Sequence, residues 1–262
     1  MTEKEVASRM PSAKRLQGKC VIVTGASNGI GAAIAALFAS HGARVAGYDR
    51  VTPAANGTAA CETFVQGDVA DAEAVAAFVA ATQRKFGTID ALVSNAGVDV
   101  FSDPLQLSPG DWLRNLEINL GGHWNFARAV LPHMLEQGSG SVVNIASVHG
   151  HKIVRGAFPY NVAKHGLIGM TKALGLEYAD RGLRFNSISP GLIRVERIER
   201  WLAAQPDPAA AEKEQTDLLP PRRIGTADEV AHTALFLASD EARFINATDI
   251  LIDGGRSQLY HE

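Results

Sequence analysis

The sequence lacks the features that mark disulfide-rich, membrane-spanning and nucleic-acid-binding proteins. Its two cysteines, Cys20 and Cys61, are too few and too far apart for a disulfide framework or a metal knuckle. The formal net charge of -3 gives no basic surface for a nucleic acid or an anionic membrane. No stretch reaches the ~18 uninterrupted apolar residues of a membrane span. We therefore expect no nucleic-acid partner and no membrane association.

A secretory signal is also missing, because the charged segment Met1–Lys19 contains no apolar block of about 7–15 residues. A reducing cytoplasm fits these features best. The composition, 46% hydrophobic and 20% charged among 262 residues, is that of a globular chain. We expect residues 1–17 to be a flexible extension and residues 18–262 to form a single domain.

Short apolar runs alternate with alanine-rich stretches whose apolar residues recur at helical spacing. The alternation predicts an α/β fold, a doubly wound Rossmann-type parallel sheet of about seven strands. The predicted strands are Cys20–Thr24, Arg44–Tyr48, Thr63–Gln66, Ala91–Ser94, Ser141–Ile145, Leu183–Ile188 and Asp249–Ile252. The predicted helices are Ala32–Ala39, Ala72–Phe86, Pro109–Gln137, Tyr160–Ala179 and Ala227–Ala238, with Asp71 and Thr226 as N-caps.

Two segments interrupt this rhythm. Val51–Ala60 is too short and too rich in proline, glycine and asparagine for a full helix. Ile193–Pro221 is long and contains Pro206 and Pro208, and it follows a late strand. A loop at that position can close over a ligand, so we interpret residues 193–221 as a substrate lid.

A glycine-rich turn follows the first predicted strand. It reads Gly25-Ala26-Ser27-Asn28-Gly29-Ile30-Gly31, and a helix comes next. Glycines allow positive φ angles and let backbone amides approach a pyrophosphate at the helix N-terminus. Between a first strand and a first helix, such a turn predicts a dinucleotide site.

Asp49 ends the second predicted strand, about 20 residues beyond the turn. A carboxylate there can accept hydrogen bonds from both adenosine ribose hydroxyls, and it repels a 2′-phosphate. The residue therefore favours NAD over NADP. The neighbouring Arg50 could instead pair with that phosphate, which leaves NADP as the alternative.

Further motifs follow in an order that resembles the short-chain dehydrogenase/reductase family, from about Gly18 to Gly255. After the turn at Thr24–Gly31 they are Asp68-Val69, Ser94-Asn95-Ala96-Gly97, Asn119, Ser147, Tyr160-Asn161-Val162-Ala163-Lys164 and Pro190-Gly191. The resemblance implies an NAD(P)-dependent oxidoreductase. Within the family the chain most resembles sugar and sugar-acid dehydrogenases, which implies a homotetramer.

The Tyr160–Lys164 pair has a chemical reason. Oxidation of an alcohol needs a base for the hydroxyl proton, and a tyrosine of pKa near 10 needs roughly 4 kcal/mol of differential stabilisation to act near pH 7. Four positions later on a helix, Lys164 lies on the same face and can favour the phenolate. The resemblance implies that Lys164 also holds the nicotinamide ribose, that Ser147 hydrogen-bonds the reacting oxygen, and that Asn119 supports a proton relay.

The resemblance also implies the remaining cofactor contacts. Asp68 and Val69 are expected at the adenine, Asn95, Ala96 and Gly97 at the adenosine ribose, and Pro190, Gly191 and Ile193 at the nicotinamide. One position departs from the family pattern. Val195 stands where a threonine often contacts the carboxamide, which puts the local loop geometry in doubt.

Polar and cationic residues dominate the segments expected around the substrate. We interpret His149, Arg155, Phe158, Arg194, Arg197 and Trp201 as candidate substrate residues. Arginine suits a carboxylate, so Arg155, Arg194 or Arg197 could bind the acid group of a sugar acid. Each arginine is equally compatible with a surface or subunit-interface position, and Trp201 with a hydrophobic lid anchor.

No metal site is expected, because His149 and His151 lack nearby cysteine or acidic ligands. The tail Asp253–Glu262 follows the last strand and could cross a subunit interface near a site, or be disordered.

Three functions remain in competition. The first is an NAD-dependent oxidation of an aldose or a 2-keto-3-deoxy sugar acid. The second is a ketone or oxoacyl reductase using NAD(P)H, against which Asp49 and the cationic segment speak. The third is a non-catalytic dinucleotide-sensing protein, which would be expected to lose Tyr160 or Lys164.

Overall fold

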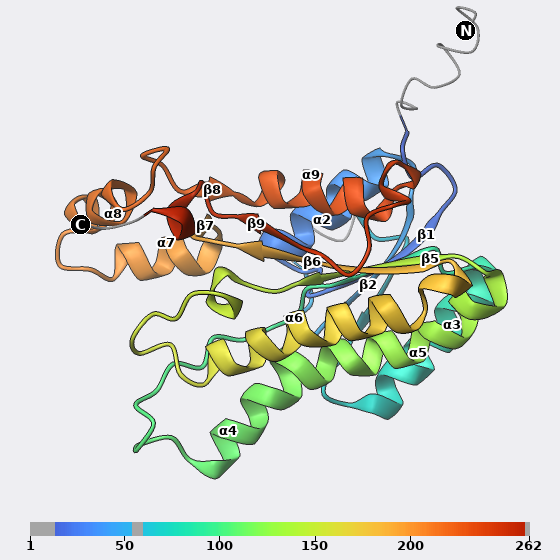
Figure 1. Ribbon diagram of the computed structural model, residues 1–262, viewed down its shortest axis with the longest axis horizontal. Coiled ribbons are helices and arrows are strands. Elements are labelled where there is room, and N and C mark those ends of the chain that lie inside the picture. Colours follow the sequence, from blue (N-terminus) through green and yellow to red (C-terminus); the bar gives the residue numbers. More distant parts are fainter. Residues whose placement is uncertain (1–13, 54–59, 260–262) are drawn as a thin grey trace, which may run out of the picture.

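Seven parallel strands form the central sheet of the chain, shown in Figure 1 as a computed structural model that describes residues 14–53 and 60–259. The spatial order is β3-β2-β1-β4-β5-β6-β9, and every neighbouring pair is parallel. The strands are β1 Cys20–Thr24, β2 Arg44–Asp49, β3 Thr63–Gln66, β4 Ala91–Ser94, β5 Gly140–Ile145, β6 Leu183–Pro190 and β9 Asp249–Ile252. The predicted fold class is confirmed.

Helices cover both faces of the sheet. Figure 1 shows α2 (Gly29–Ser40) and α9 (Ala227–Ala238) on one face. The other face carries α3 (Ala72–Phe86), α5 (Gly122–Gln137) and α6 (Tyr160–Glu177). None of the helices in the described ranges is long and apolar enough to cross a membrane.

The strands are apolar on both faces because each face is buried under helices. Along β1, Val21 and Val23 belong to the cluster that packs on α2 and α9. Cys20 and Ile22, which alternate with these valines along the strand, belong to the cluster on the other face of the sheet, together with residues of α3 and α5. This alternation follows from the two-residue period of a strand.

The predicted caps are confirmed. Asp71 accepts hydrogen bonds from the backbone amides of Glu73 and Ala74 at 3.1 and 3.0 Å. Thr226 and Glu229 form a reciprocal capping box at the start of α9.

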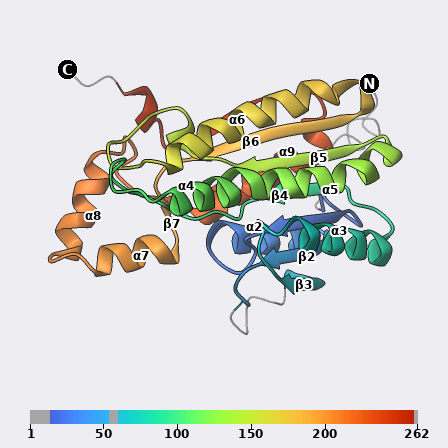
Figure 2. The same ribbon diagram turned by 90° about the horizontal axis from the view of Figure 1, so that it is seen from below.

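Two element predictions are corrected. The helix predicted over Pro109–Gln137 is divided into α4 (Pro109–Leu116), a π-helical turn (Glu117–Gly121) and α5. The segment 193–221 is largely helical, with β7 (Ile193–Arg194), α7 (Glu196–Ala203) and α8 (Pro208–Asp217). Its helices pack through a small cluster of Leu202, Leu219 and Ile224. Figure 2 shows α7 and α8 standing beyond one end of the sheet.

The described part of the chain begins with packed residues. Leu16 is fully buried, and its amide donates to the His41 carbonyl at 3.1 Å. The folded part therefore starts before Gly18. Residues 1–13 of the predicted extension lie outside the described ranges, as do 54–59 of the segment predicted to hold no full helix.

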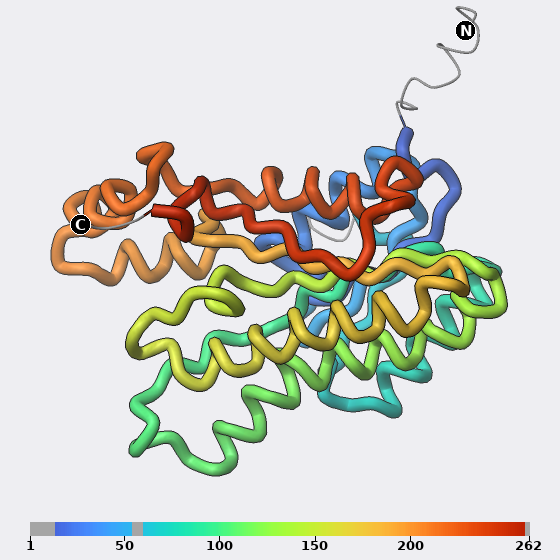
Figure 3. Tube along the Cα trace, viewed as in Figure 1, coloured from blue at the N-terminus to red at the C-terminus, as the bar shows by residue number. Residues whose placement is uncertain are grey.

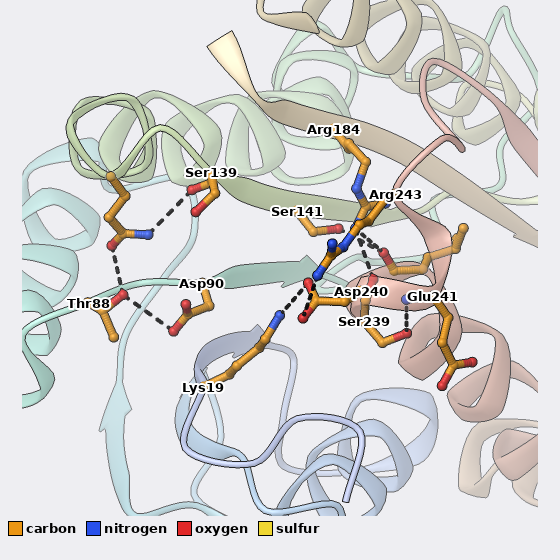
Figure 4. A network of polar contacts seen from close by, with 12 residues as sticks. Lys19, Thr88, Asp90, Ser139, Ser141, Arg184, Ser239, Asp240, Glu241 and Arg243 are labelled. Atoms are coloured by element: carbon orange, nitrogen blue, oxygen red, sulfur yellow. Dashed lines mark hydrogen bonds and ion pairs between the residues drawn. The ribbon is translucent and has the colours of Figure 1, made fainter. Parts of the chain in front are cut away.

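Polar contacts close the end of the sheet at which the strands begin (Figure 4). Lys19, just before β1, pairs with Asp240 at 2.9 Å. At the start of β6, Arg184 donates to the carbonyls of Leu237, at the end of α9, and Ser239, just beyond it, at 2.9 and 3.2 Å. These contacts hold the β1, β6 and α9 termini together and lie away from the strand ends that form the cleft.

Candidate active site

A cleft of about 1170 Å³ lies at the carboxyl ends of the strands. In a doubly wound sheet, ligands bind at this edge. Residues at the ends of all seven strands line it: Gly25 after β1, Asp49 and Arg50 at the end of β2, Asp68 after β3, Asn95 after β4, Ser147 after β5, and Gly191 and Asp253 after β6 and β9.

The glycine turn fits a pyrophosphate. Gly25 and Gly29 have φ angles of 64° and 56°, a region that other residues rarely adopt. A Cβ atom on Gly31 would lie 2.0 Å from the Gly25 carbonyl oxygen, so the turn packs closely on α2. Asn28 precedes α2 without a side-chain cap hydrogen bond, which leaves the first helical amides open to an anion.

A polar latch fixes this turn to the end of β4. The Thr24 hydroxyl oxygen accepts from the amides of Asn95 and Ala96 at 2.9 and 3.0 Å. The Asn95 side chain donates to the carbonyls of Thr24 and Gly25 at 3.0 and 3.2 Å. Asn95 lines the cleft, but its amide nitrogen is already engaged in positioning the glycine turn.

Asp49 and Arg50 line the cleft at the carboxyl end of β2. One Asp49 carboxylate oxygen accepts from the Ser27 amide at 2.9 Å, and the other accepts from the Val51 amide at 3.2 Å. Ser27 and Gly31 support the turn and are not among the cleft-lining residues of the described chain, whereas Asn28, Gly29 and Ile30 are.

Asp68 is held by a partner that the sequence did not reveal. Arg114 of α4 forms an ion pair with it at 2.5 Å, and the Ala70 amide donates to it at 2.9 Å. Burial raises the pKa of the Asp68 carboxyl, but these two hydrogen bonds outweigh burial and leave the pKa below its usual range. The remaining predicted cofactor residues on the cleft wall are Val69, Ala96, Gly97, Pro190, Gly191 and Ile193.

Tyr160 and Lys164 occupy the first turns of α6 and face the cleft together. The Lys164 ammonium nitrogen lies 5.6 Å from the centre of the Tyr160 ring and donates to the Ile145 carbonyl at 2.9 Å. Lys164 is 3% exposed. The helical spacing expected from the sequence therefore brings phenol and amine to one place.

Asn119 lies in the π-helical turn and is fully buried. Its side-chain oxygen accepts from the Val98 amide at 3.0 Å, and its nitrogen donates to the Val98 carbonyl and to the Asn115 side-chain oxygen, both at 2.9 Å. Asn115 in turn donates to the Pro159 carbonyl at 3.2 Å. The π turn thus ties the loop after β4 to the residue before Tyr160.

Burial dominates the electrostatics of the pair. Burial raises the pKa of the Tyr160 phenol, and a hydrogen bond with Ser147 lowers it only in part. Burial lowers the pKa of the Lys164 amine to about 7. Burial thus disfavours the charged form of both groups, and the stabilisation of the Tyr160 phenolate by Lys164 stays a prediction. Each charge can still stabilise the other once one of them forms.

Three side chains surround the phenol on the substrate side. The Ser147 oxygen accepts from the His149 amide at 3.2 Å. The His149 ring lies edge-on to Tyr160 with centroids 6.2 Å apart, and Phe101 does so at 5.6 Å. Sequence reasoning missed Phe101, whose one signal is its place in the loop after β4.

The predicted substrate residues divide into two groups. His149 and Arg197 line the cleft. Arg155, Phe158, Arg194 and Trp201 are not among its lining residues within the described ranges. Arg194 is paired with Glu199 and Glu212, and Phe158 stacks on Trp112 at 5.7 Å.

The chain is similar to a known protein family and to several known proteins. A family model described as enoyl-(acyl carrier protein) reductase matches residues 25–257. D-threitol dehydrogenase of Mycolicibacterium smegmatis is 41% identical over 249 residues, covering 92% of this chain and 94% of that protein. The chain belongs to the short-chain dehydrogenase/reductase family. Members of this family are oxidoreductases acting on hydroxyl or carbonyl groups, and the family implies a nicotinamide dinucleotide, NAD or NADP.

Solved members of the family have the same fold. The ligand-free aldohexose dehydrogenase of Thermoplasma acidophilum is 33% identical with a TM-score of 0.89, covering 96% of this chain and 98% of that one. Levodione reductase is 35% identical with a TM-score of 0.89, covering 94% and 100%. A levodione reductase of Leifsonia aquatica is 35% identical over 258 residues, covering 94% of this chain and 97% of that protein.

Proposed function

We propose that this short-chain dehydrogenase oxidises a hydroxyl group of a small sugar or sugar acid, with NAD as the hydride acceptor. The observation that carries the proposal is the convergence of Ser147, Tyr160 and Lys164 at one end of a cleft. Its other end is formed by Asp49.

The Asp49 carboxylate supports NAD over NADP. Its two oxygens are held by the amides of Ser27 and Val51, so the negative charge stays at the adenosine end. A 2′-phosphate there would meet this charge, whereas ribose hydroxyls would donate to it. Arg50 also lines the cleft and is the group through which NADP would be accepted.

The chemistry assigned to the chain is proton transfer and orientation. The Ser147 hydroxyl donates to the reacting oxygen, and the Tyr160 phenolate accepts the hydroxyl proton as the substrate is oxidised. The Lys164 ammonium stabilises the phenolate, and the Asn119 network holds the residue before Tyr160 in place. The dinucleotide, when bound, supplies the acceptor for the hydride.

The class of substrate is supported by the relatives and by the cleft. D-threitol dehydrogenase and aldohexose dehydrogenase are named for polyhydroxylated substrates. The wall beside Tyr160 includes the polar side chains of His149 and Lys152 together with the apolar ring of Phe101. Levodione reductase and the description of the family model favour a second candidate, a ketone or acyl reductase. The Asp49 carboxylate disfavours the use of NADPH by such a reductase.

Further expectations stay proposals of the same kind. A homotetramer would cover exposed apolar side chains on the outer helices and the sheet edge, among them Leu113, Trp124, Val162, Leu176 and Leu251. The segment 193–221 contributes Ile193, Glu196 and Arg197 to the cleft wall, which supports its role as a lid. The two free cysteines are compatible with the cytoplasm.

The test is a spectrophotometric screen of polyols, aldoses, aldonates and 2-keto-3-deoxy acids with NAD⁺ and with NADP⁺. We expect NADH formation with at least one polyhydroxylated compound and a higher kcat/KM with NAD⁺. Turnover confined to NADPH and ketones would favour the reductase. Dinucleotide binding without any turnover would favour a sensing protein.

A further inference from the structure

The arginines first assigned to an acidic substrate group are already engaged. Arg194 pairs with Glu199 at 2.6 Å and with Glu212. Arg197 pairs with Asp99 across the cleft. Because these carboxylates neutralise both guanidinium groups, a substrate anion would have to displace them.

Among the other cations that line the same cleft, Lys152 and Arg256 follow the strands β5 and β9. Lys152 lies in the segment that follows Ser147, and Arg256 lies in the short 3₁₀ helix Arg256–Gln258 after β9. Neither has a carboxylate partner in the part of the chain that the structure describes. Figure 3 shows the red C-terminal segment at the same end of the molecule as the orange segment that holds α7 and α8.

His149 lies beside the catalytic phenol and contacts the backbone of the segment that carries Lys152. Its Nδ1 faces the Lys152 carbonyl at 3.4 Å, and its ring lies edge-on to Tyr160. Burial lowers the pKa of His149, and the charge of Arg256 lowers it as well. Because a carbonyl can only accept, Nδ1 carries the proton of the neutral ring. Nε2 is then left as an acceptor.

The nearby acids do not neutralise this corner. Asp253, which also lines the cleft, accepts from the amides of Gly255 and Ser257 at 2.9 and 2.8 Å and so shapes the turn that carries Arg256. Asp99 is paired with Arg197. Neither cation forms an ion pair within the described ranges, so the corner offers two charged donors and one neutral acceptor.

We propose that Lys152 and Arg256 form an anion subsite that binds a carboxylate or phosphate group of the substrate, while His149 Nε2 accepts from a neighbouring hydroxyl. Guanidinium and ammonium groups make charge-assisted hydrogen bonds to such oxygens. The inference rests on the proposed function and narrows it to hydroxylated acids or sugar phosphates. Specificity then comes from the C-terminal segment rather than from the lid arginines.

Matched substrates test the subsite. Each aldonate is compared with the polyol of equal carbon number and with a sugar phosphate, in wild type, Arg256→Ala, Arg256→Lys and Lys152→Ala. We expect Arg256→Ala to lower kcat/KM for one class of anion by roughly 10- to 100-fold, mostly through KM, and for polyols by less than about 3-fold. Arg256→Lys should recover part of the loss. The exposed Arg84 on α3 supplies the control, Arg84→Ala.

The class of anion that loses turnover identifies the group, carboxylate or phosphate. Equal losses on charged and neutral substrates, or no loss on any, would overturn the subsite while leaving the dehydrogenase proposal intact.

A binding measurement separates the two proposals if no compound is turned over. Titration calorimetry of D-gluconate and of inorganic phosphate into the NADH complex reports the subsite without chemistry. Binding that is lost in Arg256→Ala and kept in Arg84→Ala supports it. Absence of binding, or equal binding by wild type and Arg256→Ala, contradicts it.

Discussion

The two ends of the sheet use polar residues in opposite ways. Where the strands begin, Lys19 pairs with Asp240, and Arg184 donates to backbone carbonyls (Figure 4). Where the strands end, the α2 N-terminus has no side-chain cap, and Lys152 and Arg256 have no carboxylate partner in the described ranges. Satisfied groups stabilise the fold, and unsatisfied groups are available to ligands.

Tyr160→Phe should give the largest effect, and this effect should be on turnover and not on stability. Loss of the proton acceptor is expected to lower kcat roughly 10³-fold, whereas removing a buried hydroxyl should leave thermal stability nearly unchanged. Turnover is measured as NADH absorbance, and the fold by circular dichroism. Tyr178→Phe on the far end of α6 is the matched control, and an active Tyr160→Phe variant would refute the mechanism.

Arg184→Ala should produce the reverse result at the other end of the sheet. Carbonyls of Leu237, Ser239 and Ile245 would each lose one of their donors, at a cost of about 2 kcal/mol in the free energy of unfolding. Activity per folded molecule should stay within about 2-fold. Denaturant unfolding and active-site titration measure the two quantities, and Arg184→Lys should restore part of the stability. A variant that is stable but inactive would contradict the assignment of stability to this end of the sheet and of activity to the other end.

Asp49→Ala should change cofactor preference without changing stability much. Loss of the carboxylate removes the repulsion of a 2′-phosphate and the acceptor for ribose hydroxyls. We expect the ratio of kcat/KM for NADP⁺ to that for NAD⁺ to rise roughly 10- to 100-fold. Asp180→Asn, on an exposed turn, controls for net charge. An unchanged ratio would mean that Asp49 does not select the cofactor.

His123→Gln should have the smallest effect, visible only as a change in pH dependence. Burial, and then the charge of Lys164, lowers the pKa of His123 to about 3 from 6.5. Below pH 6.5 the unfolded chain takes up a proton that the folded chain refuses, so stability falls as pH falls. Each pH unit costs about 1.4 kcal/mol. Between pH 7 and 5, the free energy of unfolding should change less with pH in the variant than in wild type. An equal pH dependence of the two would argue against a neutral buried imidazole.

The sheet could be predicted because its signals are local. Each strand is a short apolar run ended by a turn, and burial on both faces imposes that pattern along the whole run. The cofactor turn and the Tyr160–Lys164 pair were equally accessible, since their residues lie within one or two turns of each other.

The parts that the sequence did not reveal depend on distant contacts. The sequence suggested that Arg194 is available to bind a substrate anion, but the packing of α7 on α8 places Glu212 beside it. The π turn at Glu117–Gly121 inserts one extra residue into a helix, and the spacing of the apolar residues along the sequence stays almost unchanged. Arg256 reaches the cleft because β9 ends beside β6, far along the chain from Ser147. The burial of Lys164, which lowers the pKa of its amine to about 7, also depends on distant packing and could not be predicted from its spacing to Tyr160.

The burial of Lys164 has a consequence for calorimetry. With a pKa of about 7, its amine is midway through titration in neutral buffer, so a modest change in local potential shifts its average proton content. Any charged ligand that enters the cleft will therefore exchange a fraction of a proton with the medium. The apparent binding enthalpy will then vary with the ionisation heat of the buffer, and the slope of that variation counts the protons that Lys164 and its neighbours gain or lose.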